Sequence, residues 1–207
     1  MSEVRDTLVI ACGALAREII ALQRANGWTR LEVTCLPAEL HNRPERIPEA
    51  VRTAIRENRD RYGTIFVAYA DCGTGGRIDA MLREESVERL PGAHCYEFFA
   101  TSALFESLAQ AEPGTFYLTD FLLRHFDRLV TRGLGLDRHP ELAAEYFRHY
   151  RKLVYLAQTQ NEPAREQARA IAARMNLAFE YRFTGYGELA VSLGRLVQRG
   201  VRPEWRA

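Results

Sequence analysis

The chain has 207 residues, 47% of them hydrophobic, and its 28 basic and 27 acidic side chains leave a formal net charge of +1. This balance gives no electrostatic footprint for nucleic acid. No apolar run approaches the roughly 18 residues of a membrane span, and Met1–Thr7 carries acids without an apolar signal segment. We therefore expect a globular cytoplasmic protein, without nucleic-acid or membrane partners, that binds small molecules or other proteins.

The first half of the chain alternates short apolar runs with helical patterns. The apolar runs are typical of strands covered on both faces, and the segments between them repeat apolar residues at helical spacing. The expected strands, all three inner strands of the sheet, are Thr7–Ala11, Leu31–Cys35 and Ile65–Tyr69. The expected helices are Ala14–Ala25, Pro48–Arg61 and Arg77–Glu85, and Arg89–Cys95 returns the chain to the sheet. A polar, proline-marked loop, Leu36–Pro44, follows the second strand, and such loops often carry function.

The second half continues the same alternation. The expected strands are Gly114–Leu118, Leu153–Ala157 and Leu177–Phe183, the expected helices are Tyr96–Ala109, Phe121–Thr131, Pro140–Arg151, Pro163–Arg174 and Glu188–Gln198, and Pro203–Ala207 is expected to be a frayed tail. Strands that alternate with helices predict an α/β fold, with a mainly parallel, doubly wound sheet of about seven strands and helices on both faces. We expect one domain, residues 1–207, or two lobes that divide near residues 133–140.

All four cysteines fall at or just past the carboxyl ends of successive predicted strands. They are Cys12, Cys35, Cys72 and Cys95. Ligands of open α/β sheets bind beyond these strand ends, and cysteines in a cytoplasmic chain indicate thiol or metal chemistry in preference to disulfides. With His41 and His94 the edge offers ligands for zinc or for an iron–sulfur cluster. No pair has the local spacing of a zinc ribbon, so inert core cysteines and metal-free redox or nucleophilic thiols stay open as alternatives.

Cys72 and Cys95 are expected to lie close together, within reach of one ion. Of the two histidines, His41 is the preferred ligand because its loop can fold over the edge from the side. His94 adjoins Cys95, and neighbours in an extended segment point to opposite faces. His94 therefore has a second-shell or proton-transfer role as its alternative, with a pKa set by the neighbouring thiolate and Asp71.

Two glycine-rich turns add candidates for binding and catalysis. Backbone amides of the first turn could hold an anion at a helix start, and Asp71 could act as a general base or orient a ligand histidine. A second turn could close over the same crevice and bring a tyrosine. The candidates are Asp71, Gly73, Thr74, Gly75 and Gly76 in the first turn and Gly185 and Tyr186 in the second. For both turns the alternative is a purely structural role, with an Asx turn at Asp71.

Four segments resemble a known family. They are Leu40-His-Asn42, Asp71-Cys-Gly-Thr-Gly-Gly76, His94-Cys-Tyr-Glu-Phe-Phe99 and Gly114-Thr-Phe-Tyr-Leu118. From Cys12 to about Glu188 the chain resembles the bacterial and archaeal family catalogued as domain of unknown function 1638. Members tend to be encoded beside corrinoid methyltransferases, corrinoid-binding proteins and their reductive activators. The resemblance therefore implies a role in cobalamin-dependent one-carbon transfer, with such a protein as partner and the corrinoid carried by it.

Two functions follow as expectations. In the first, the chain is a metal-dependent enzyme or accessory factor of methyl transfer, in which Cys72, Cys95 and His41 or His94 hold zinc or an iron–sulfur cluster, with Cys12 and Cys35 as further ligands. Zinc would activate a thiol substrate, and a cluster would pass electrons to the corrinoid. In the second, the chain is a non-catalytic docking partner of a corrinoid protein or its reductive activator.

Overall fold

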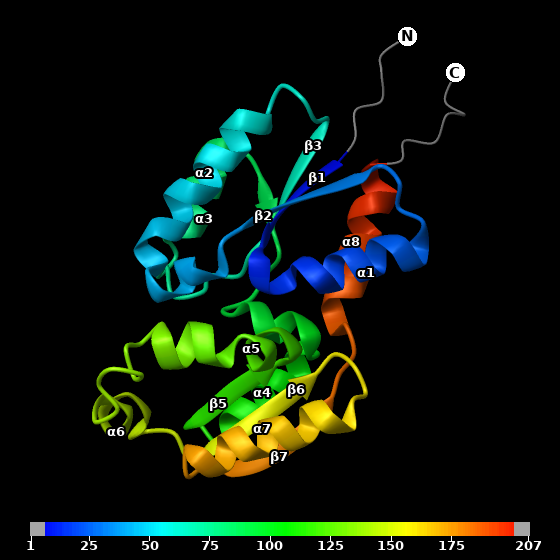
Figure 1. The fold of residues 1–207 in the computed structure, drawn as a ribbon. Helices are drawn as coiled ribbons and strands as arrows, with labels where there is room; N and C mark the ends of the chain where they lie inside the picture. Colours follow the sequence, from blue (N-terminus) through cyan, green and yellow to red (C-terminus); the bar gives the residue numbers. More distant parts are fainter. Residues whose placement is uncertain (1–6, 201–207) are drawn as a thin grey trace, which may run out of the picture. The chain divides into compact units, whose positions relative to one another are not determined.

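The structure, a computed structural model, describes residues 7–200, which form two compact units. Unit 1 comprises the chain up to Cys95 and again from Glu188, and unit 2 comprises Tyr96–Gly187. Each unit has its own parallel sheet (Figure 1). The predicted α/β class and its seven strands are confirmed, but the strands form two sheets, of four and three, where one was expected. Residues 133–140, the predicted lobe break, lie inside unit 2.

The sheet of unit 1 has the strand order β2-β1-β3-β4, with every pair parallel. Its strands are β1 (Thr7–Cys12), β2 (Leu31–Leu36), β3 (Thr64–Ala68) and β4 (Glu88–Arg89). All six residues of β1 are buried, as a central strand requires. The expectation that Leu31–Cys35 is an inner strand was wrong, because β2 forms an edge. Its side chains explain this place, since Glu32 and Cys35 are exposed.

Helices cover both faces of this sheet, as the doubly wound prediction requires. They are α1 (Ala16–Asn26), α2 (Ile47–Asn58), α3 (Arg77–Glu85) and α8 (Gly187–Gly200), with the short 3-10 helices η1 (Gly13–Leu15), η2 (Ala38–Asn42) and η3 (Pro44–Arg46). In Figure 1, α2 and α3 lie on one side of the strands, and α1 and α8 lie on the other. Helix α2 buries Ile47, Val51, Ala54 and Ile55, the helical spacing that turns one apolar stripe to the sheet.

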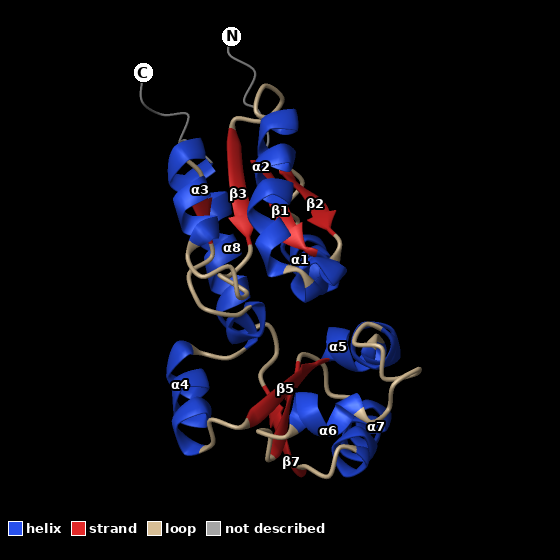
Figure 2. Ribbon diagram, turned by 90° about the vertical axis from the view of Figure 1, so that its left-hand side faces the viewer, coloured by secondary structure: helices blue, strands red, loops and turns tan. Residues whose placement is uncertain are grey.

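The sheet of unit 2 has the order β5-β6-β7, also parallel throughout. Its elements are β5 (Thr115–Thr119), β6 (Lys152–Ala157), β7 (Ala178–Phe183), α4 (Ser102–Ala111), α5 (Asp120–Arg124), the π-helix η5 (Asp127–Arg132), α6 (Leu142–Phe147) and α7 (Glu162–Arg174). Alternate residues of β6 separate its two cores. Leu153, Tyr155 and Ala157 pack with α5, η5 and α7, whereas Val154 and Leu156 pack with Leu108 of α4. Figure 2 shows α4 on one side of these strands and α7 on the other.

Several predicted boundaries differ from the structure. Strand β4 ends at Arg89, so residues 90–94 form a loop and Cys95 begins the 3-10 helix η4 (Cys95–Phe99). The helix predicted over 96–109 is therefore interrupted before α4, the one over 121–131 is α5 followed by η5, and the one over 140–151 shortens to α6. The predicted tail, Pro203–Ala207, lies outside the described residues. Between residues 7 and 200 no helix has the length and apolar character to cross a membrane.

Candidate metal centre

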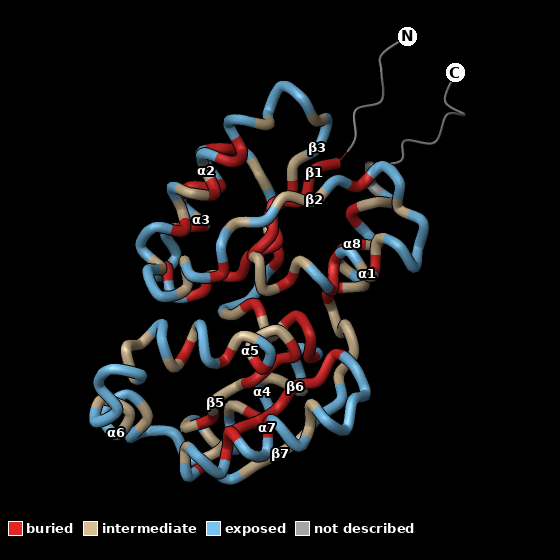
Figure 3. The backbone as a smooth tube through the Cα atoms, in the orientation of Figure 1, coloured by how far each residue is buried: buried red, intermediate tan, exposed pale blue. Residues whose placement is uncertain are grey.

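The strand order of unit 1 reverses at β1 and β3. The chain leaves β1 toward β2 on one side and continues through β3 to β4 on the other. Sheets with this order bind ligands where the order reverses, outside the carboxyl ends of the two central strands. Cys12 is the last residue of β1, and Cys72 follows β3. Strand β1 is buried along its whole length and β3 over its last three residues (Figure 3), so both strands are buried where they reach this edge.

Cys12 is fixed where β1 turns into η1. Its side chain is buried, and its Sγ accepts a hydrogen bond from the backbone N–H of Ala14 at 3.3 Å, which caps η1. Gly13 allows this turn to pass close to β2, since a Cβ there would lie 3.0 Å from the carbonyl oxygen of Leu36. The sulfur therefore points from a rigid strand end and not from a mobile loop.

Cys72 and Cys95 are brought together by backbone pairing of two loops. The N–H of Asp71 donates to the carbonyl of Gly92 at 3.1 Å, and the N–H of Cys72 donates to that of Ala93 at 2.8 Å. The two sulfur atoms consequently lie 3.1 Å apart, which confirms the expectation that these cysteines are close. Cys72 adopts a φ of 50°, a left-handed conformation that is uncommon outside glycine.

His41 reaches the same place from η2, after the edge strand β2. Its Nδ1 lies 3.8 Å from Cys12 Sγ and 3.0 Å from the carbonyl oxygen of Ala38, and its ring stacks on Tyr69 with centroids 6.2 Å apart and planes 13° apart. Ligand atoms of Cys12, His41 and Cys95 all lie within 4.8 Å of one another. When Nδ1 donates to the Ala38 carbonyl, Nε2 carries the lone pair, which is the usual arrangement of a metal-binding histidine.

The close approach of the Cys12, His41, Cys72 and Cys95 side chains shifts the pKa of each of them. A hydrogen bond with Cys95, assisted by His41 and opposed by burial, lowers the pKa of both Cys12 and Cys72 to about 5. Burial favours neutral His41, yet its contacts with the Cys12 and Cys72 thiolates raise its pKa to about 11. The pKa of Cys95 is raised by the same two neighbours and by complete burial. At neutral pH the group therefore holds two thiolates, one thiol and an imidazolium.

Tyr69 belongs to this site although the sequence analysis did not select it. It is fully buried, and its hydroxyl has no hydrogen-bond partner. Burial raises the pKa of the phenol, and the charges of Cys12 and Cys95 raise it further, so the hydroxyl keeps its hydrogen. The signal that could have found it is a lone polar atom at the end of an otherwise apolar strand.

The glycine-rich turn after Cys72 is held by hydrogen bonds to Asp71, within the same segment. Asp71 accepts hydrogen bonds from the Thr74 hydroxyl at 2.6 Å, from the Gly75 N–H at 3.1 Å and from the Gly76 N–H at 2.7 Å. The amides proposed for an anion are thus occupied by a carboxylate of the chain, as in the structural alternative. Burial opposes and these bonds favour ionised Asp71, with a net lowering of its pKa. Gly73 has a φ of 84° and packs beside Pro44.

The other two predicted ligands, Cys35 and His94, are not members of the group formed by Cys12, His41 and Cys95. Cys35 is exposed near the end of the edge strand, and its pKa is raised by partial burial and by the Cys12 charge. His94 is half-buried and is not in the group that surrounds His41. Gly185 and Tyr186 belong to unit 2, in the turn between β7 and α8.

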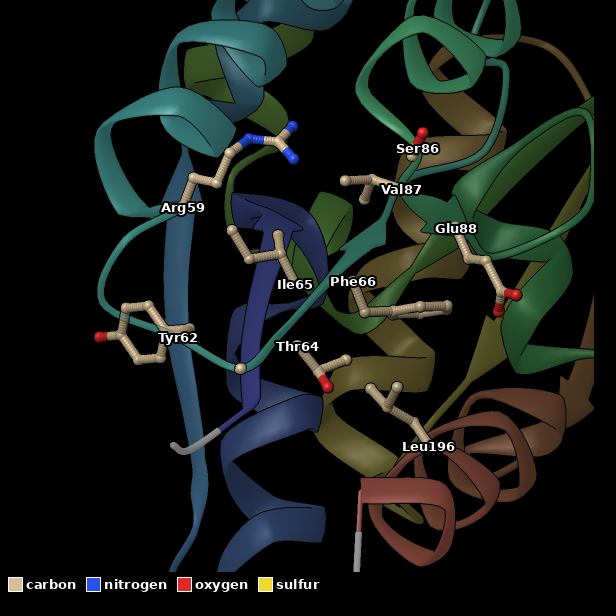
Figure 4. Close-up of a pocket in the computed structure, with 10 residues that line it drawn as sticks. Arg59, Tyr62, Thr64, Ile65, Phe66, Ser86, Val87, Glu88 and Leu196 are labelled. Carbon is tan, nitrogen blue, oxygen red and sulfur yellow. The ribbon is translucent and has the colours of Figure 1, made fainter. Parts of the chain in front are cut away.

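A pocket of about 330 Å³ opens at the opposite end of the same sheet. It is lined by the first residues of β3, by residues 86–88 before and in β4, and by Arg59 and Leu196 (Figure 4). The Arg59 guanidinium is occupied, since its Nη2 donates to the carboxylate and the carbonyl of Glu85. The pocket therefore lies at the amino ends of the strands, away from the thiols.

The donor set suits a single metal ion. Three sulfurs and one imidazole are a common tetrahedral set for zinc, in which bonds of about 2.3 Å to sulfur place neighbouring ligand atoms about 3.8 Å apart. The ligand atoms of Cys12, His41 and Cys95 lie within 4.8 Å of one another, close enough for one ion. Cys72 adjoins this group through Cys95, whose sulfur lies 3.1 Å from its own.

Comparison with protein families matches residues 35–193 to the family described as protein of unknown function (DUF1638). The match covers more than half of the chain. The chain belongs to this family. The matched range includes His41, Cys72 and Cys95 and most of both units, whereas Cys12 precedes it. Searches of the curated proteins and of the solved structures found no significant match.

Proposed function

We propose that the DUF1638 protein binds one zinc ion through Cys12, His41, Cys72 and Cys95 and acts in cobalamin-dependent methyl transfer, as an enzyme or accessory factor. The observation that carries the proposal is the convergence of three sulfurs and an imidazole at the topological switch point of unit 1. The proximity of these groups lowers the pKa of Cys12 and Cys72 to about 5, which favours the thiolate form that binds a metal ion, and raises the pKa of His41 to about 11.

The spacing supports a single ion over a [4Fe–4S] cluster. Two ligands of one ion stand no further apart than twice the bond length, about 4.6 Å with sulfur. Each cysteine of a [4Fe–4S] cluster binds a different iron atom, so these cysteines stand further apart than cysteines that share one ion. The sulfur–sulfur separation of 3.1 Å between Cys72 and Cys95 fits two ligands of the same ion.

The chain's own residues would orient and protect the centre. His41 is held by Ala38 and by the face of Tyr69, and Cys12 is held by the Ala14 N–H. Bound zinc would supply Lewis acidity that keeps a sulfur ligand as a thiolate near neutral pH. Burial of Cys12, Cys72 and Cys95 limits contact of the sulfurs with water, and bound zinc would offset the unfavourable effect of that burial on a thiolate charge.

The link to corrinoids is supported by the resemblance of the four segments around His41, Cys72, Cys95 and Thr115 to proteins encoded beside corrinoid methyltransferases. A thiolate can attack the methyl carbon of methylcobalamin, which forms a carbon–sulfur bond, breaks the cobalt–carbon bond and leaves cob(I)alamin with the electron pair. The corrinoid would be presented by a partner protein, either a corrinoid-binding protein or its reductive activator.

The test begins with protein purified without air and without chelators. We expect about one equivalent of zinc in the wild type by elemental analysis, and loss of most of it in Cys12→Ser, Cys72→Ser, Cys95→Ser and His41→Ala. Cys35→Ser is the matched control, since it removes an exposed thiol outside the group. Iron with sulfide would instead support a cluster, and metal-free wild-type protein after zinc addition would contradict the metal centre.

The methyl-transfer part has a separate readout. Zinc-loaded protein is mixed with methylcobalamin and a low-molecular-weight thiol, and the cobalamin spectrum is followed in the absence of air. Faster demethylation that disappears in Cys72→Ser supports an enzyme. A zinc-loaded protein that binds cobalamin or a corrinoid protein without accelerating the reaction supports an accessory or docking role. If the protein neither binds the corrinoid nor accelerates the reaction, this result contradicts the corrinoid proposal. The proposed metal centre is unaffected by that result.

A further inference from the structure

The hydroxyl of Tyr69 is buried and has no hydrogen-bond partner among the described residues, which is energetically unfavourable. A buried polar group without a hydrogen bond costs about 1–3 kcal/mol, so such groups are uncommon in native interiors. Tyr69 is fully buried, and its hydroxyl meets no acceptor among the described residues. An acceptor must therefore form when the site is complete.

The surroundings of the ring identify that acceptor. His41, which stacks on the Tyr69 ring, has its Nδ1 3.8 Å from Cys12 Sγ, and the Cys12 charge acts on the phenol more strongly than those of Cys95 and Cys72. The His41 ring stacks on the Tyr69 ring, so any movement of His41 onto an ion shifts the phenol with it. Cys12 also accepts from the Ala14 N–H on another side.

We propose that Tyr69 is a positioning residue that donates its hydroxyl hydrogen to the metal-bound Cys12 thiolate, which makes Cys12 the least nucleophilic of the three sulfurs. This inference rests on the proposed metal centre and adds a division of roles to it. Cys12 carries two donors and is fully buried, whereas Cys72 and Cys95 retain slight exposure, 7% and 6%. An electrophile such as a methyl group is thereby directed to Cys72 or Cys95, and Cys12 stays a permanent ligand.

The experiment compares wild type, Tyr69→Phe and Tyr155→Phe, each loaded with cobalt(II) in place of zinc. Tyr155 is the matched control, a fully buried tyrosine of unit 2 whose hydroxyl donates to Asp120 at 2.7 Å. Loss of a hydrogen bond to a thiolate makes the sulfur a better electron donor, so we expect the sulfur-to-cobalt charge-transfer band of Tyr69→Phe to move to lower energy. The control band should not move.

Alkylation gives the second readout. Zinc-loaded proteins are treated with iodoacetamide, and each cysteine is quantified by peptide mass spectrometry. We expect Cys12 to react about threefold faster relative to Cys72 in Tyr69→Phe. This factor follows from loss of one charge-assisted hydrogen bond and a dependence of thiolate reactivity on basicity of about half a log unit per pKa unit.

The outcomes separate this inference from the proposed function. Cobalt-bound Tyr69→Phe with an unchanged band and unchanged Cys12 reactivity would overturn the role of Tyr69 alone. A wild type that takes up no cobalt would overturn the metal centre and this inference with it. If Tyr69→Phe does not fold, 3-fluorotyrosine at position 69 keeps the shape and strengthens the donor, so the band should move to higher energy. No movement there would overturn the inference.

Discussion

The thiol Cys95 and the imidazolium His41 are the two ligands that still carry protons at neutral pH. Cys12 and Cys72, with pKa values of about 5, are already thiolates, whereas the pKa of Cys95 is raised and that of His41 is about 11. Metal ligands must be deprotonated. Zinc uptake at pH 7 should therefore release about two protons, one from Cys95 and one from His41.

Titration calorimetry in buffers of different ionisation enthalpy measures this number. Because zinc displaces protons, affinity should rise as pH rises from about 6 to about 8, by roughly two log units for each pH unit. Below pH 5, where Cys12 and Cys72 also gain protons, the dependence should become steeper. Zinc affinity that does not change with pH would contradict the charge distribution described for the group.

Substitution of the four cysteines should lower the affinity for zinc to different extents. Loss of one sulfur ligand should weaken zinc binding by at least about a hundredfold, since outer-shell changes alone already cost 10–100-fold. Cys12→Ser should show this loss in a competition assay with a chromophoric chelator, whereas Cys35→Ser should bind as the wild type does. Equal affinity of both variants would exclude Cys12 as a ligand.

At the scale of elements, the contribution of the Asp71 turn to stability can be tested without substitution of a cysteine. Asp71→Ala removes three hydrogen bonds, to the Thr74 hydroxyl and to the amides of Gly75 and Gly76. Since bonds to a charged group contribute about 1.5–3 kcal/mol when well formed and this carboxylate is partly solvated, we expect a net loss of about 2 kcal/mol in unfolding free energy.

Urea denaturation of the metal-free protein measures the loss. Asp127→Ala is the control, because its ion pair with Arg132 is exposed on both sides and should contribute less than about 1 kcal/mol. Zinc should also dissociate faster from Asp71→Ala, since Cys72 is anchored in the same turn. Stability equal to that of the control variant would show that the turn holds its shape without the carboxylate.

The elements also show where sequence reasoning reached its limit. Short apolar runs predicted β1, β3 and the parallel pairing, because burial on both faces leaves a pattern in the sequence. The position of β2 at the edge depends on the crossover connections, which no local pattern records. Likewise, the helix predicted over 96–109 misses the turn at Ala100–Thr101, whose cap is a hydrogen bond from the Leu104 N–H to Thr101.

The site was predictable to the extent that the strand ends determine it. Cys12 and Cys72 follow directly from the ends of β1 and β3, and the approach of His41 follows from a loop long enough to fold over the edge. Cys95 comes to Cys72 through backbone hydrogen bonds between two loops, a tertiary contact. Tyr69 and the closure of the Asp71 turn depend on side-chain geometry, so the sequence could not rank them.

For the whole molecule, the residues of the proposed metal centre all belong to unit 1, and the effect of zinc on stability should be confined to that unit. At a free zinc concentration about one hundred times the Kd, binding stabilises the folded state by about 2.7 kcal/mol. In hydrogen exchange, amides of residues 12–15, 38–42, 71–76 and 92–95 should become protected by up to about a hundredfold. Amides of β5, β6 and β7 in unit 2 should exchange at the same rate with and without zinc. Equal protection in both units would show that they unfold together.

Unit 1 is built from two separated stretches of chain, and this has a consequence for biosynthesis. All four ligands lie between Cys12 and Cys95, whereas α8, which buries Leu189 and Leu193, is translated only after the whole of unit 2. Domains generally fold from the amino terminus during synthesis. The thiols therefore leave the ribosome before the helix that completes their unit, and a nascent chain could take up the proposed metal while α1 alone covers that face of the sheet.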